Sequence, residues 1–345
     1  MTAQSFGRPL ALTMGDPAGI GPELALRAWL ARASLAAPFF VLADPKALDA
    51  LARRLGLDAP IAEVSPAQTS AAFSHALPVV ALAQRADARP GEPDPAFASA
   101  TIESIERAVG YVRSGDASAV VTNPIAKRTL YEAGFKFPGH TEYLGALAAS
   151  WGAPAQPVMM IWSPALAVVP VTIHVALSEV PRLLTRELIV STARIVAADM
   201  TRRFGLARPR LALAGLNPHA GEGGAMGREE IETITPAIAE LRAEGLDVAG
   251  PLPADTMFHA AARARYDVAL TMYHDQGLIP AKTLAFDTGV NVTLGLPFVR
   301  TSPDHGTAFD IAGSGRADPS SLVAAIKLAA RLSPHARPAA AAKHE

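Results

Sequence analysis

Three histidines have the residue type and sequence context to bind a catalytic metal ion. His174 ends the run Val-Thr-Ile-His, His219 ends Leu-Asn-Pro-His, and His274 follows Thr-Met-Tyr. Each comes at or shortly after the end of an expected strand, where ligands of parallel sheets bind. Three neutral imidazoles with open coordination positions can hold a divalent ion. The spacings are too wide to form a metal motif alone, and each histidine could instead bond to the backbone at its strand end.

A second group of side chains suits a phosphate monoester. Lys282, Asn291 and Arg300 offer two cations and an amide across an expected turn and strand. The segment Pro-Gly-His-Thr-Glu-Tyr puts His140 and Thr141 at an expected helix N-terminus, where free N–H groups favour anions. Simpler interpretations exist for each residue. The first three could be surface or strand-edge side chains, and Thr141 could merely cap its helix.

Three loops could approach a ligand closely. The turn 15–23, Gly-Asp-Pro-Ala-Gly-Ile-Gly-Pro-Glu, follows a strand and opens a helix. It lacks the lysine and hydroxyl of a P-loop and the spacing of a dinucleotide fingerprint, so a tight structural turn explains it at least as well. The glycine-rich loop 217–224 either meets a ligand or simply makes a long turn. The loop 301–313 is polar enough to require a functional explanation.

Two carboxylates are candidates for the general base of a reaction at these loops. Asp275 follows His274 and could instead orient an imidazole from behind the metal. Asp255 could equally be the N-cap of the helix that it begins. The residues by themselves leave the base unassigned.

Short β-rich runs alternate with Ala- and Leu-rich helical stretches, which predicts parallel strands joined by crossover helices. No low-complexity linker divides the chain, and the end from 333 to 345 reads as a frayed tail. The expected strands are Pro9–Met14, Pro38–Leu42, Ala119–Thr122, Val168–His174, Arg210–Leu216 and Val268–Tyr273. The expected helices begin at Pro22, Glu103, Thr141, Glu179, Arg228, Asp255 and near Ser320.

Composition narrows the class of protein. Half of the 345 residues are hydrophobic, 18% are charged, and the net charge is -1. Because no basic block is present, we expect neither nucleic acid nor an anionic membrane surface as the main partner. The chain has no cysteine, which excludes disulfides, thiolate nucleophiles and cysteine-based metal sites. Residues 1–7 lack a signal-peptide pattern, so a cytoplasmic enzyme is expected.

The apolar segment 157–177 is long enough to suggest a membrane span. However, Pro157, Pro164 and Pro170 interrupt it. Two buried strands joined at Ser163-Pro164 fit better, because strands of parallel sheets read as continuous apolar runs. We therefore expect no membrane segment.

Five strings occur in order between Gly15 and about Ala317: GDPAGIGPE, PGHTEYL, NPHAGEGG, YHDQGLIPAK and GVNVTLGLPFVRTSPDHGTAFDIAG. This series resembles the 4-hydroxythreonine-4-phosphate dehydrogenase family of pyridoxal phosphate (vitamin B6) biosynthesis. Its final segment is also similar to the cofactor loop of isocitrate and isopropylmalate dehydrogenases. The resemblance implies an α/β fold of that type, with two lobes around a central cleft and no Rossmann fingerprint. One lobe, 1–130 plus 285–345, would carry the cofactor loop, and the other, 131–284, the metal and dimer contacts.

The same resemblance implies a role for each matched position. Zinc, magnesium or cobalt would bind His174, His219 and His274, with ligands contributed from two subunits of a homodimer. The substrate would contact His140, Thr141, Lys282, Asn291 and Arg300. NAD or NADP would contact Asp304, His305, Gly306, Thr307, Asp310 and Gly313. The implied reaction oxidises 4-phosphooxy-L-threonine to 2-amino-3-oxo-4-(phosphooxy)butyrate, which decarboxylates to 3-amino-2-oxopropyl phosphate.

Three other functions compete with this one. Sister dehydrogenases of phosphorylated sugar acids or cis-dihydrodiols share the metal and cofactor strings. A phosphotransacetylase-like acyltransferase has a similar fold but needs neither metal nor NAD, so the three histidines disfavour it. A catalytically inactive metal- or anion-binding protein is disfavoured because no matched position is missing.

Overall fold

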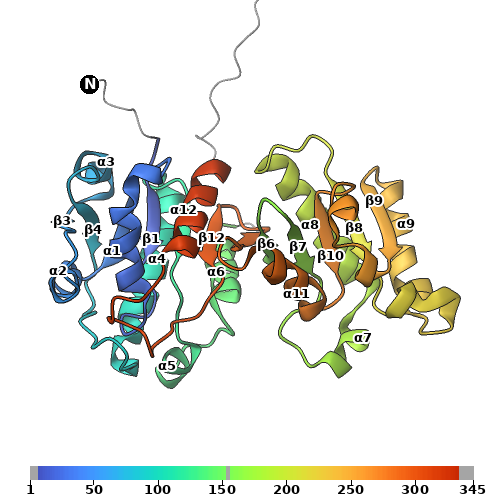
Figure 1. The fold of residues 1–345 in the computed structure, drawn as a ribbon, viewed down its shortest axis with the longest axis horizontal. Helices are drawn as coiled ribbons and strands as arrows, with labels where there is room; N and C mark the ends of the chain where they lie inside the picture. The colour runs from blue at the N-terminus through green and yellow to red at the C-terminus, as the bar shows by residue number, and fades with distance from the viewer. Residues whose placement is uncertain (1–6, 153–155, 334–345) are drawn as a thin grey trace, which may run out of the picture. The chain divides into compact units, whose positions relative to one another are not determined.

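The computed structural model describes residues 7–152 and 156–333 (Figure 1). The predicted frayed tail lies outside these residues except for Ser333, as does almost all of the segment 1–7. Two compact units emerge, one formed by 1–155 with 296–345 and the other by 156–295. The lobe boundaries expected from the sequence were 130/131 and 284/285. The observed divisions fall later, so His140 and Thr141 belong to the first unit.

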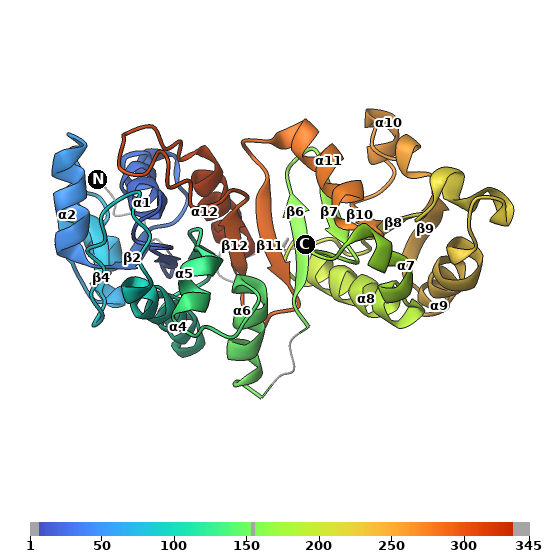
Figure 2. The same ribbon diagram turned by 90° about the horizontal axis from the view of Figure 1, so that it is seen from below.

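The first unit is built on a sheet whose neighbouring strands all pair in parallel. Its helices cover both faces: α1 (Gly21–Leu30) and α12 (Ser320–Leu332) lie on one, α4 (Ala98–Ser114) and α6 (His140–Ala149) on the other (Figure 2). Strands covered on both faces are buried and apolar, as the sequence pattern predicts. The strand order is β3 (Ile61–Glu63), β4 (Leu77–Ala81), β2 (Phe39–Ala43), β1 (Leu10–Thr13), β5 (Val120–Thr122), β12 (Arg300–Pro303).

Helix α2 (Pro45–Arg54) shows how local sequence starts an element in this unit. Asp44 is its N-cap, and the carboxylate accepts hydrogen bonds from the N–H groups of Lys46 and Ala47. Pro45 occupies the first helical position, where no N–H is needed. Leu48 and Leu51 are buried on the inner face. The short helices α3 (Thr69–Ala72) and α5 (Lys127–Glu132) complete the unit.

The second unit has a mixed sheet. Helices α8 (Arg186–Arg202) and α9 (Thr235–Ala243) lie on one face, and α10 (Ala260–Arg263) and α11 (His274–Ala285) on the other (Figure 2). Helix α7 (Val180–Leu183) precedes α8. Its strand order is β11 (Val290–Leu294), β6 (Val158–Trp162), β7 (Ala167–Pro170), β10 (Val268–Thr271), β8 (Arg210–Ala214), β9 (Asp247–Leu252).

The expectation of parallel strands is wrong for β6. This strand pairs antiparallel with both β7 and β11. The link between β6 and β7 is a tight turn in which the N–H of Ser163 donates to the carbonyl of Leu166 at 2.9 Å. Such a turn is far too short for the crossover that parallel strands require. The expected pair of buried strands in 157–177 is nevertheless present, and no helix in the described residues is long and apolar enough to cross a membrane.

All six expected strands are confirmed, with ends that shift by up to four residues. The largest shift concerns His174, which was expected to end its strand but lies four residues beyond the end of β7 at Pro170. His274 is the first residue of helix α11, shortly after β10 ends at Thr271. Pro280 lies inside this helix, and a proline normally argues against a helix interior. The helices α2, α3, α5 and α11 and the strands β3, β4, β9, β11 and β12 were not among the expected elements.

Candidate active site

Two of the three candidate metal-binding histidines meet in the second unit. His174 and His274 line one cavity of about 280 Å³, together with Thr172, Tyr273 and Asp275. Their ring centroids are 5.6 Å apart. The carboxylate of Asp275 lies 2.7 Å from Nδ1 of His274, which orients that ring and leaves its Nε2 available for a ligand. The pair therefore fits two of the three imidazole ligands that the sequence predicts.

His219 does not line that cavity. It begins a run of residues with left-handed backbone, in which His219, Ala220 and Glu222 have φ of 52°, 53° and 42°. Each non-glycine residue in this region costs on the order of 1 kcal/mol, so the surroundings must hold the turn. The buried carboxylate of Glu230 does so by accepting hydrogen bonds from the backbone N–H (2.7 Å) and side-chain amide (3.0 Å) of Asn217.

Within 7–152 and 156–333, no three histidine, aspartate or glutamate side chains converge closely enough to hold a metal ion. The expectation that two subunits share the ligands stays a prediction.

The first unit contains a buried, positively charged cluster at its candidate phosphate site. Arg300 is only 3% exposed, and burial lowers the pKa of its guanidinium to about 10. Its Nε and Nη2 atoms donate to Oγ1 of Thr122 at 3.1 and 2.7 Å. Nε2 of His140 is buried and has no hydrogen-bond partner within the described residues. Burial, then the positive charges of Arg300 and Lys127, hold the pKa of His140 well below its usual value.

This cluster suits an anion because a buried donor without a partner and a buried cation are both costly unless a ligand satisfies them. His140 is the first residue of α6, and Gly139 is its N-cap, so the interpretation of Thr141 as the N-cap is wrong. Thr141 instead occupies the second helical position, next to the free N–H groups of the first turn.

The two remaining candidate phosphate ligands belong to the second unit. Lys282 lies half-buried in the last turn of α11. Asn291 lies on β11, and its Oδ1 atom is buried without a hydrogen-bond partner in the described residues. A buried amide oxygen in that state is available to a ligand.

The candidate cofactor loop, 304–313, belongs to neither helix nor strand in the first unit. His305, Gly306 and Asp310 are exposed along it. Ala308 has a φ of 41° without being a glycine. Exposed backbone and a carboxylate suit the hydroxyls and amines of an adenosine, so the loop fits the dinucleotide that the resemblance implies.

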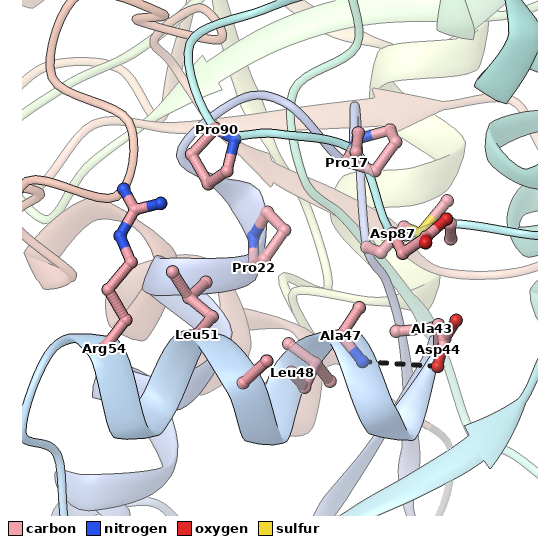
Figure 3. A pocket seen from close by; sticks show the side chains of 14 residues that line it. Pro17, Pro22, Ala43, Asp44, Ala47, Leu48, Leu51, Arg54, Asp87 and Pro90 are labelled. Atoms are coloured by element: carbon pink, nitrogen blue, oxygen red, sulfur yellow. Dashed lines mark hydrogen bonds between the residues drawn. The ribbon is translucent and has the colours of Figure 1, made fainter.

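An apolar cavity of about 190 Å³ lies next to this loop (Figure 3). Leu48 and Leu51 of α2 form one wall, and Pro17 and Pro22 of the turn 15–23 face them. Arg54, at the end of α2, reaches past the cavity to donate to the carbonyl of Gly313 at 2.7 Å.

The candidate bases lie in the second unit. Asp255 and Asp275 line one open groove of about 430 Å³ with Phe258, Tyr273 and Gln276. Asp255 is part of the 3₁₀ segment Ala254–Thr256, whose N-cap is Pro253. The alternative interpretation of Asp255 as an N-cap is therefore wrong, and its carboxylate remains a candidate for chemistry.

Two functional candidates were not recognised in the sequence. Lys127 is the first residue of α5, shortly after strand β5 ends. Its side chain lies beside Gly139, the N-cap of α6, because a Cβ at Gly139 would be 3.3 Å from Cε of Lys127. Glu23 is fully buried in the turn 15–23. Two features of the sequence could have indicated these residues. Lys127 follows a parallel strand, where ligands often bind, and Glu23 lies inside a glycine-rich motif.

Comparisons with known proteins identify the family to which the chain is similar. Residues 34–329 match the family described as "Pyridoxal phosphate biosynthetic protein PdxA". A 4-hydroxythreonine-4-phosphate dehydrogenase of Methylorubrum extorquens is 64% identical over 95% of each chain. The crystal structure of a 4-hydroxythreonine-4-phosphate dehydrogenase from Klebsiella pneumoniae has a TM-score of 0.85 and 37% identity, covering 94% of this chain and 99% of that one.

A more distant likeness involves a terephthalate 1,2-cis-dihydrodiol dehydrogenase from Burkholderia xenovorans LB400. It is 30% identical with a TM-score of 0.64, over 94% of this chain and 98% of that one. The predicted α/β fold class and family resemblance are thereby confirmed. The chain belongs to the pyridoxal phosphate biosynthetic protein PdxA family.

Proposed function

We propose that this protein is the dehydrogenase that oxidises 4-phosphooxy-L-threonine in pyridoxal phosphate biosynthesis. The observation that carries the proposal is the buried cluster of His140 and Arg300, in which Nε2 of His140 has no hydrogen-bond partner within the described residues and Arg300 brings a buried positive charge. Membership of the family supports the substrate, since relatives up to 64% identical bear this activity in their names. The cis-dihydrodiol alternative rests on a relative of only 30% identity.

The phosphate end of the substrate would bind the cluster. Arg300 and His140 would donate to phosphate oxygens, and the N–H groups at the start of α6, beside Thr141, would add the helix dipole. Lys282 and Asn291 are proposed as further contacts of the substrate. Because the dianion would compensate the buried Arg300 charge, an unphosphorylated substrate should bind much less well.

The oxidation removes a hydride from the carbinol carbon and a proton from its oxygen. NAD or NADP, bound along Asp304–Gly313, would accept the hydride. Asp255 or Asp275 would take the proton, since both carboxylates line one groove. The resulting β-keto acid loses carbon dioxide to give 3-amino-2-oxopropyl phosphate.

His174 and His274 would hold a divalent ion such as zinc, magnesium or cobalt. When bound, the ion would stabilise negative charge that develops on the substrate oxygen, a contribution of several kcal/mol in comparable sites. Asp275 would keep the His274 ring in position through its 2.7 Å contact with Nδ1.

The third ligand would be His219 from a second copy of the chain, so the enzyme would act as a homodimer. The second unit supports this, because it contains seven of the nine large hydrophobic side chains that are exposed in the described residues. A concentration of exposed apolar side chains on one unit is what an interface with a second copy would cover. The seven are Val175, Leu177, Met226, Ile231, Ile279, Leu284 and Phe286.

We place the enzyme in the cytoplasm.

A substrate panel followed at 340 nm tests the function. It contains 4-phosphooxy-L-threonine, 4-hydroxy-L-threonine, a phosphorylated sugar acid and a cis-dihydrodiol, each with NAD or NADP and with or without a chelator. We expect nicotinamide reduction with the first compound and its loss on chelation. Preferential turnover of the dihydrodiol would contradict the proposed substrate, and no nicotinamide reduction with any of the four compounds would contradict the reaction class.

A further inference from the structure

The candidate cofactor loop, 304–313, continues without helix or strand to Ala317, and one buried carboxylate holds this extension, 314–317. Glu23 is 0% exposed. One of its oxygens accepts the N–H of Ala317 at 3.1 Å, and the other accepts the N–H of Gly315 at 3.3 Å. Arg27, one turn along α1, donates to Glu23 at 2.9 Å and also to the carbonyl of Gly315. The loop is thus tied to the first helix through its backbone, independently of its side chains.

A second tie comes from α2. Arg54 donates to the carbonyl of Gly313 at 2.7 Å, and its side chain extends from the end of α2 along the apolar cavity (Figure 3). Gly313 has a φ of +62°, and a Cβ there would lie 2.3 Å from Nη2 of Arg54 and 2.8 Å from Cβ of Pro90. Only glycine permits this approach, so the contact depends on the backbone conformation.

The start of the loop is held by the turn 15–23. The N–H of Ile20 donates to the carbonyl of Thr307 at 3.0 Å. Directly after this contact, Ala308 adopts its left-handed conformation. A non-glycine residue stays in this strained conformation only where surrounding contacts hold its backbone in place. Such residues are common at ligand-binding sites. The loop is therefore constrained at both ends and strained between them.

We propose that Glu23, Arg27 and Arg54 are positioning residues that hold the loop 304–317 in its dinucleotide-binding conformation before the dinucleotide arrives. The inference rests on the proposed function, in which this loop binds NAD or NADP. It also gives the turn 15–23 a role: the motif is a support for the cofactor loop rather than a phosphate cradle. A loop ordered beforehand loses less conformational entropy on binding, which strengthens affinity without any new contact to the ligand.

Arg54 provides the sharpest test because it is exposed enough to be replaced without unfolding the protein. Arg54→Met keeps the aliphatic stem against the cavity but removes the donor to Gly313. Arg54→Lys retains a donor. Arg53→Met is the matched control, since Arg53 is the neighbouring exposed arginine of α2 and pairs with Asp49.

Two quantities are measured on the full-length enzyme: the Kd of NAD by calorimetry, and hydrogen exchange of the amides of 304–317 without NAD. For Arg54→Met we expect NAD affinity to fall about three- to tenfold, faster exchange in the loop, and a raised KM for NAD with an unchanged KM for substrate. Arg54→Lys should recover most of the affinity, and Arg53→Met should match the wild type.

Three outcomes would overturn the inference. Unchanged NAD affinity in Arg54→Met would show that the hydrogen bond from Arg54 to Gly313 does not contribute to NAD binding. Unchanged hydrogen exchange in the loop would show that this bond does not order the loop. An equal rise in both KM values would indicate a general structural role. If the wild type itself binds neither NAD nor NADP, the proposed function fails, and the inference fails with it.

Discussion

His140 and Arg300 form a buried pair of donors that repel each other in their charged forms. Nε2 of His140 is buried without a partner in the described residues, and Arg300 is 3% exposed. Burial, and secondarily the charges of Arg300 and Lys127, keep the pKa of His140 well below 6.5. The imidazole therefore stays neutral at pH 7, where it can donate one hydrogen bond to an anion without adding a second buried charge.

The first prediction concerns stability against pH. Because the folded-state pKa of His140 is depressed, unfolding is accompanied by proton uptake below about pH 6.5, and the contribution of His140 to stability is lost as pH falls from there. The wild type should lose about 1 kcal/mol more stability than His140→Gln between pH 6.5 and 5.5. Urea unfolding of both proteins at these pH values measures the difference. Parallel curves would mean that His140 is not buried as a neutral ring.

The second prediction separates phosphate binding from folding. Arg300→Met should raise KM for 4-phosphooxy-L-threonine by roughly 10- to 150-fold, which corresponds to about 1.5–3 kcal/mol of lost charge-assisted bonding. KM for 4-hydroxy-L-threonine should change much less. Stability should stay level or increase, because the variant no longer buries a cation. Equal losses on both substrates would show that Arg300 serves the fold or the cofactor.

The third prediction concerns Lys127. Lys127 is exposed, but its positive charge contributes to the lowered pKa of His140. The same charge should therefore attract a phosphate bound at His140. Lys127→Met should weaken competitive inhibition by inorganic phosphate about two- to fivefold. Arg128→Met is the control, since Arg128 lies next on α5 and pairs with Glu132 instead. Indistinguishable inhibition constants for the two variants would exclude a role for Lys127 at the site.

The fourth prediction tests the shared metal site. His219→Ala and His274→Ala should each lose metal and turnover while remaining folded, because two imidazoles retain the ion poorly. Mixing them should restore activity, since each heterodimer regains one site with no lesion. His174→Ala mixed with His274→Ala should stay inactive, because these two rings line one cavity of the same chain. Subunit exchange has to be verified independently.

No recovery in the first mixture would place all three ligands in a single subunit. Recovery in the second mixture would show that His174 and His274 serve different metal ions. Metal analysis that finds full occupancy in His219→Ala would remove this residue from the ligand set.

Much of the fold was predictable because its signals are local. Apolar runs such as Leu10–Thr13 and Val268–Thr271 identify strands of a covered sheet wherever they occur. The order of the strings identified the family. The antiparallel strand β6 was missed as such, because an apolar run carries no information about the direction of its neighbours.

The sequence also indicated which residues could form the candidate site. It did not indicate which of them are buried or which of them lie close together. The sequence determined that His140, Arg300 and the three histidines are available for binding. Only the tertiary structure decided that Arg300 is buried against Thr122, that His174 and His274 share a cavity without His219, and that Glu23 supports the loop after Gly313. The contacts of Glu23 span almost the whole chain. Burial, and contacts between residues far apart in sequence, depend on how distant strands pair, and no local pattern of residues encodes that.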